Sequence, residues 1–222
     1  MSALALPHAR FDLDFRWRER PTPDLLPTGI AELDAVTGGL PRGALTGIYG
    51  PASSGRTSLL LSLLAEATRR QEFCALVDAT DSLDPASAQA ADVDLSRLLW
   101  IRCAGNAEHA LKAADLLVAS GGFGMVAMDL GDVAQQTARR ISLASWFRLR
   151  RVVEHTPTVL VALEREPNAK TCASLVLDLH GSKIHWSGTP GCSHLLRGLS
   201  CTAERLKPVG ARTVVFGAST LE

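Results

Sequence analysis

One segment of eight residues constrains the fold of this chain more than any other. It reads Gly50-Pro51-Ala52-Ser53-Ser54-Gly55-Arg56-Thr57. This matches the phosphate-binding frame G-x-x-x-x-G-K-[ST] at every fixed position but one, where arginine replaces lysine. A hydrophobic run, residues 45–49, precedes the segment, and a run rich in helix formers, residues 58–65, follows it. The pattern predicts a glycine-rich loop between a buried strand and the start of a helix, and a chance Gly/Ser-rich turn is the alternative.

The chemistry of such a loop depends on the residue at the lysine position. Backbone N–H groups and the helix dipole favour an anion, the lysine is a compact charge between the outer phosphates, and the Thr57 hydroxyl would hold Mg²⁺. Arg56 keeps the charge but is longer, planar and forked, so the replacement is not conservative. We therefore predict a degenerate nucleotide site whose loop residues are Gly50, Ser53, Ser54, Gly55, Arg56, Thr57 and Ser58.

Composition narrows the class of protein. With 222 residues, 46% of them hydrophobic, the chain suits one large domain or one domain with arms. Lys+Arg and Asp+Glu both number 23, so no global positive field attracts nucleic acid, and we expect DNA contact to be weak or indirect. No apolar stretch approaches the length of a membrane span and no secretion signal begins the chain, which predicts a cytoplasmic protein. Five cysteines without a C-x-x-C pair argue against a disulfide framework.

Apolar runs alternate with helical stretches from residue 45 onward. This is typical of an α/β fold with a mostly parallel central sheet and helices on both faces. Strands are expected at residues 45–49, 73–78, 98–102, 123–130, 158–163, 174–179, 183–186, 202–206 and 213–216, and helices at 58–65, from Asp84-Pro85, at 107–120 and at about 141–155. Three strands end in or just before an acid, namely Asp78, Asp129 and Glu164. Such sheets bind ligands at this edge.

The first 27 residues follow a different pattern. Apolar residues alternate with charged ones, which predicts a strand on an arm. The arm either folds back onto its own domain or adds to a partner's sheet edge or groove. The candidate interface residues are Phe11, Leu13, Phe15 and Trp17.

A basic set lies on or beside the helix expected at about 141–155. Trp146 and Phe147 fall between its members. Such a face either contacts phosphates or an acidic partner, or is a solvated helix face with the aromatic side chains packed inward. The residues are Arg139, Arg140, Arg148, Arg150 and Arg151.

Several segments, taken in order, resemble the RecA recombinase core. They are Leu26-Pro27-Thr28-Gly29-Ile30, Leu33-Asp34, Gly38-Gly39-Leu40-Pro41-Arg42-Gly43, the loop itself, Val77-Asp78-Ala79, Leu83-Asp84-Pro85 and Leu177-Asp178-Leu179. The resemblance implies a RecA-like P-loop core with a C-terminal antiparallel extension. We accordingly expect an N-terminal arm at 1–27, a core at 28–217 and a tail at 218–222.

The resemblance also indicates which catalytic groups have changed. Thr80 stands where the family has the glutamate that activates the attacking water, and a threonine hydroxyl cannot accept a proton at neutral pH as a carboxylate does. Asp129 matches the acidic strand end that organises magnesium, together with Thr57. Asp84 matches a residue near the adenine, but Ser87 replaces the aromatic side chain that stacks there. Together with Arg56, these changes weaken each step of hydrolysis.

The DNA-binding side is also reduced relative to the family. Only residues 164–171 separate two strands where RecA carries its second mobile loop. A short RecA-like chain of this kind looks like the ImuA group of damage-response proteins. That likeness implies a non-catalytic accessory role in error-prone translesion synthesis, with an inactive Y-family-like polymerase, an error-prone polymerase or RecA as partners.

Two alternatives remain at the level of sequence. The first is an active DNA-dependent ATPase or recombinase paralogue that tolerates Arg56 and uses Asp81 or Glu164 as its base. The second concerns cofactors. The ImuA-like reading requires none, and weak binding of ATP with Mg²⁺ is the alternative to an empty loop.

Overall fold

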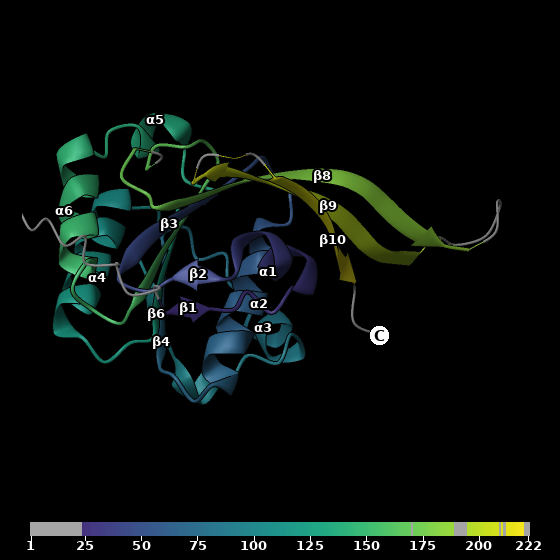
Figure 1. The fold of residues 1–222 in the computed structure, drawn as a ribbon, viewed down its shortest axis with the longest axis horizontal. Coiled ribbons are helices and arrows are strands. Elements are labelled where there is room, and N and C mark those ends of the chain that lie inside the picture. Colours follow the sequence, from purple (N-terminus) through teal and green to yellow (C-terminus); the bar gives the residue numbers. More distant parts are fainter. Residues whose placement is uncertain (1–23, 170, 189–194, 209, 211, 220–222) are drawn as a thin grey trace, which may run out of the picture.

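A twisted sheet forms the middle layer of the molecule (Figure 1), which we describe from a computed structural model. The structure describes residues 24–169, 171–188, 195–208, 210 and 212–219. Within these residues the main sheet has eight strands in the order β10-β9-β8-β3-β7-β6-β4-β5. The strands are β3 (Ala44–Tyr49), β4 (Cys74–Asp78), β5 (Leu98–Arg102), β6 (Met125–Asp129), β7 (Val159–Glu164), β8 (Leu175–Ser187), β9 (Leu195–Lys207) and β10 (Arg212–Ser219).

Six neighbouring strands, from β8 to β5, run parallel, and β9 and β10 continue the sheet in antiparallel pairing. The expected α/β class, with a mostly parallel sheet and a C-terminal antiparallel extension, is therefore confirmed. The parallel strands are hydrophobic throughout because both of their faces are covered. Their carboxyl ends meet at one edge of the sheet, and that edge carries the candidate site.

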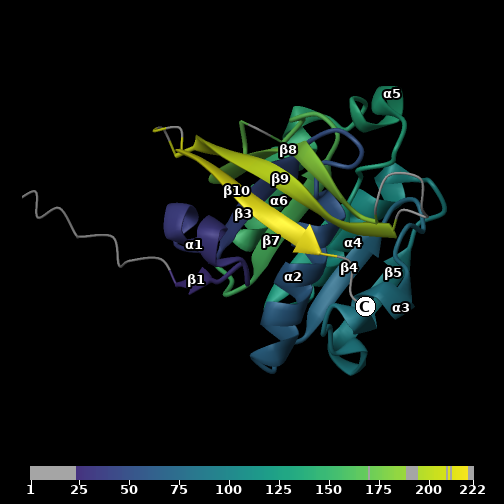
Figure 2. The ribbon, with the colours of Figure 1, turned by 90° about the vertical axis from the view of Figure 1, so that its right-hand side faces the viewer.

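Helices cover both faces of the sheet (Figures 1 and 2). One face packs α4 and α6, whose Ala110 and Trp146 join Val77 in a buried cluster. The other face packs α2, whose Leu63 joins Leu76 in a second cluster. The helices are α1 (Ala31–Thr37), α2 (Arg56–Arg69), α3 (Pro85–Ala90), α4 (Ala107–Ser120), α5 (Gln135–Ala138) and α6 (Leu143–Val153), with a 3₁₀ turn at Leu95–Arg97.

Side chains at the helix starts explain why several helices begin where they do. The Asp84 carboxylate accepts from the Ser87 N–H, and Pro85 occupies the first position of α3, as expected. Asn106 accepts from the N–H groups of Glu108 and His109 and so caps α4. The helix expected at 107–120 is thus confirmed at both ends.

A small second sheet ties the start of the described chain to the core. In it β1 (Leu25–Leu26) pairs antiparallel with β2 (Leu40–Pro41), and Leu26 is fully buried. The predicted arm, residues 1–27, therefore ends in a strand that belongs to the core, because Leu26 completes the apolar layer around α2. The candidate arm residues Phe11, Leu13, Phe15 and Trp17 lie outside the described residues.

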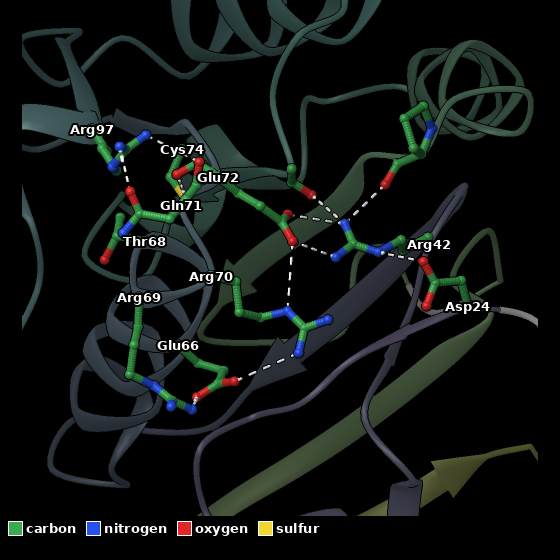
Figure 3. A network of polar contacts seen from close by, with 12 residues as sticks. Asp24, Arg42, Glu66, Thr68, Arg69, Arg70, Gln71, Glu72, Cys74 and Arg97 are labelled. Atoms are coloured by element: carbon green, nitrogen blue, oxygen red, sulfur yellow. Dashed lines mark hydrogen bonds and ion pairs between the residues drawn. The ribbon is translucent and has the colours of Figure 1, made fainter.

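Arg42 joins the amino-terminal edge of the sheet, opposite the candidate site (Figure 3). Its guanidinium donates to both carboxylate oxygens of Glu72, at 2.7 and 3.1 Å, and to the backbone oxygens of Gly124 and Pro157. It also pairs with Asp24 at 3.1 Å. One nearly buried side chain thus connects the segments that precede β1, β4, β6 and β7.

The C-terminal strands form a long antiparallel ribbon that extends beyond the helices (Figures 1 and 2). The two strands expected at 174–179 and 183–186 are one continuous strand, β8, with register shifts against β9. The strand expected at 202–206 starts earlier, at Leu195, and the one at 213–216 extends to Ser219 into the predicted tail. Within the described residues, no helix is long and apolar enough to cross a membrane.

Candidate nucleotide-binding site

The predicted loop lies between β3 and α2 at the carboxyl edge of the sheet, as the sequence pattern indicates. Gly50 must be glycine, because a Cβ there would come within 2.2 Å of the Leu179 carbonyl oxygen. Gly55 ends the loop with a φ of 91°, a left-handed conformation that favours glycine. The loop is therefore built by the strand, helix and glycine spacing that define a phosphate cradle.

The antiparallel ribbon packs directly against this loop. A Cβ on Gly55 would lie 2.5 Å from the Cys201 Sγ of β9 and 3.5 Å from the Phe216 ring of β10, and one on Gly181 would lie 2.6 Å from the Ser53 carbonyl oxygen. Sequence reasoning did not place Cys201, Phe216 or Gly181 at the site. They come from strands far along the chain, and only the isolated glycine in a strand pattern signalled a close backbone approach.

Arg56, the substituted residue, points from the loop to the end of β6. Its side chain is only 10% exposed, and Nη2 lies 3.6 Å from the Asp132 Oδ1. A Cβ on Gly131 would lie 2.2 Å from Nη1, so the guanidinium packs against the Gly131 backbone. Nη1 is buried and has no hydrogen-bond acceptor among the described residues.

Asp129 ends β6 beside this guanidinium. Its Oδ1 accepts the Gly131 N–H at 2.8 Å. Burial raises the pKa of the Asp129 carboxyl, and the nearby charge of Arg56 and the Gly131 hydrogen bond act in the opposite direction. A divalent ion shared by Asp129 and the exposed Thr57 would therefore meet a guanidinium already facing that carboxylate. As these residues lie, they do not fit a divalent ion.

Thr80 occupies a buried loop after β4 that Asp78 organises. The Asp78 carboxylate accepts from the backbone N–H groups of Thr80, Ser82 and Leu83 and from the Trp100 ring N–H. Burial alone would raise the pKa of Asp78, but these donors hold it below its usual value. The Thr80 hydroxyl itself is buried without a partner. Asp78 therefore shapes the loop, and its carboxylate is fully engaged in doing so.

The two alternative carboxylates differ in their surroundings. Asp81 pairs with Arg102 of β5 at 3.0 Å and has a φ of 59°. Glu164 is 2% exposed at the end of β7, where its Oε2 accepts the Ala169 N–H at 3.0 Å. Burial raises the pKa of Glu164 to about 7, against the opposing hydrogen bonds of Ala169 and Asn168. Of the two, Glu164 has the proton affinity that a general base needs at neutral pH.

A groove of about 1040 Å³ runs along the exposed side of α2 from the end of the loop. Ser58 and Ser87 line it near the loop, with Phe216 and Gly217 of β10 on one wall. Asp84, predicted near the base of a nucleotide, uses its carboxylate to cap α3 through Ser87. The groove supplies length and polar hydroxyls beside the loop, and Phe216 is its aromatic residue.

The basic set is divided between two helices and is partly neutralised. Arg148 on α6 makes a bidentate contact with Asp115 of α4, at 2.6 and 3.1 Å. Arg139, at the end of α5, pairs with Glu166 at 2.9 Å. Trp146 is buried, as the solvated-face alternative predicts, whereas Phe147 remains 47% exposed. The exposed cations that remain are Arg140, Arg150 and Arg151.

The fold and the loop define the class of protein: a P-loop α/β domain with its anion cradle at the carboxyl edge of a mostly parallel sheet. The family model of the RecA N-terminal domain matches residues 18–140. The chain belongs to the RecA N-terminal domain family.

Curated relatives agree with this assignment. The chain is 44% identical to "Protein RecA" of Methylococcus capsulatus (strain ATCC 33009 / NCIMB 11132 / Bath) over 108 residues, which covers 48% of this chain and 31% of that protein. It is also 44% identical to "Protein RecA" of Gluconacetobacter polyoxogenes over 118 residues, covering 51% and 34%. The match thus spans about a third of the length of these relatives.

Proposed function

We propose that this chain is a non-catalytic RecA-like accessory protein of the DNA-damage response, resembling the ImuA group, that binds polymerase-type partners in error-prone translesion synthesis. The observation that carries the proposal is the replacement of the water-activating carboxylate by Thr80, whose hydroxyl is buried in a loop held by Asp78. The family relationship supports a place in DNA repair and recombination.

Two further observations support a binding role. The neighbouring acid, Asp81, is held by Arg102, so it does not replace the missing glutamate. The second loop of the family has shrunk to residues 164–171, which the structure shows as a tight turn between β7 and β8 around the Glu164 carboxylate. A RecA-like core without these parts retains surfaces and loses chemistry.

Steady-state ATP hydrolysis, with and without single-stranded DNA, tests the absence of catalysis. We expect turnover far below the scale of about one per second at which ordinary enzymes begin. Binding is tested separately by co-expressing the chain with an inactive Y-family-like polymerase and with an error-prone polymerase, and measuring which of the two is retained. Retention of neither polymerase would contradict the accessory role.

A second function, a DNA-dependent ATPase, is favoured by one observation. Glu164 is a buried carboxyl with a pKa of about 7 at the sheet edge beside the loop. Turnover near one per second that is abolished by both Asp129→Ala and Glu164→Gln would establish this function. Loss with Asp129→Ala alone would leave Glu164 without a catalytic role.

A further inference from the structure

We propose that Arg56 supplies, from within the chain, the positive charge that a divalent ion supplies in other phosphate loops. The loop then binds the polyphosphate chain of its ligand without metal. This inference replaces the magnesium expected at Thr57 and Asp129 and is independent of the accessory role, which needs no bound nucleotide.

The position of the guanidinium is the first support. It lies at the end of β6, where an acidic strand end faces the phosphate loop, with Asp132 at 3.6 Å and the Gly131 backbone against Nη1. The side chain is nine-tenths buried, so its charge is held at this place by packing. A glycine at 131 is required, because any side chain there would collide with the guanidinium.

The state of Asp129 is the second support. One of its oxygens is occupied by the Gly131 N–H, and its charge is opposed by Arg56. Like charges repel strongly at short range, so a divalent ion and this guanidinium compete for one carboxylate. The arrangement already contains its counter-charge.

Unused hydrogen-bond donors are the third support. Arg56 Nη1 and Ser54 Oγ are both buried and have no partner among the described residues. They belong to the loop whose N–H groups open the fourteen-residue helix α2, a geometry that favours anions. A guanidinium offers paired donors that match two phosphate oxygens, which a lysine does not.

The test is calorimetric titration of the full chain with ATP, once in excess EDTA and once in excess Mg²⁺. We expect the wild-type protein to bind ATP in EDTA at least as tightly as in Mg²⁺. Arg56→Lys should weaken binding in EDTA about tenfold and recover in Mg²⁺, because lysine offers a point charge without the fork. Arg69→Lys, at an exposed position of the same helix, is the matched control and should behave as wild type.

A second variant keeps the test sharp if Arg56→Lys fails to fold. Asp132→Asn changes a 60% exposed side chain and should tighten metal-free binding about threefold by removing a competing anion from Arg56. Inorganic tripolyphosphate is titrated in parallel. Binding as tight as that of ATP would assign the site to the phosphates alone, and tighter ATP binding would add the nucleoside, and either result supports the proposal.

Three results would overturn it: wild-type binding that requires Mg²⁺, no binding of either probe in EDTA, or unchanged metal dependence in Arg56→Lys with intact folding. None of these results bears on retention of the polymerase partners, so failure of this inference is distinguishable from failure of the proposed function.

Discussion

At the scale of single residues, Glu164 should make stability depend on pH. Its folded pKa of about 7 lies above the ordinary value of 4.5, so the folded state holds a proton that the unfolded state releases. Stability is therefore highest below about pH 4.5 and falls as pH rises to about 7, and the cost is complete above that value. A shift of this size corresponds to about 3 kcal/mol. Glu164→Gln should remove most of this slope.

The measurement is the free energy of unfolding in urea at pH 5 and pH 7.5, for the wild type and for Glu164→Gln. Burial also raises the pKa of Asp129, which adds a slope of the same sign, so the comparison between the two proteins isolates Glu164. Parallel pH profiles for the two proteins would show that Glu164 is ionised without cost in the fold.

At the scale of elements, Arg42 should act as a clamp on the segments that precede four strands. Arg42→Ala removes the partner of Glu72 and the donor to two backbone oxygens. We expect a loss of about 2–4 kcal/mol in the free energy of unfolding, since the groups left behind are partly buried. Arg70→Ala is the control, because Arg70 is 43% exposed and its contacts are at 3.6 and 3.9 Å. Equal losses in the two variants would contradict the clamp.

The elements also show what the sequence could predict. The helix α4 follows from local signals, a capping Asn106 and a terminating Gly121, and the parallel strands from their continuous apolar runs. The strand β8 was divided at Gly181 because a glycine usually weakens a strand. Here the Ser53 carbonyl oxygen comes so close that only glycine fits.

The candidate site divides in the same way. The phosphate loop is local, so its residues and its place between β3 and α2 were predicted. The contacts of Cys201 and Phe216 with the loop depend on how the antiparallel ribbon folds back, and no periodicity encodes that distance along the chain. The direction of Arg56, toward Asp132 and Gly131, likewise depends on tertiary packing.

At the scale of the whole molecule, the described core accounts for its own stability. From Asp24 onward the chain contains every strand of both sheets and both buried clusters. The alternating residues Phe11 to Trp17 are therefore available, in the sequence-based hypothesis, for a partner's sheet edge. We predict that deleting residues 1–20 leaves the melting temperature within about 2 °C of the full chain and weakens self-association or retention of the polymerase partner.

Calorimetry and sedimentation check this prediction, and the alternating pattern provides a matched pair of variants in the full chain. Serine at the four apolar positions, Phe11, Leu13, Phe15 and Trp17, should reproduce the loss of association. Serine at Asp12, Asp14 and Arg16 should not, because a strand that adds to a sheet buries one face and leaves the other in water. A large fall in melting temperature would show instead that the arm folds back onto its own domain. Unchanged oligomeric state together with unchanged partner retention would remove the arm from the interface.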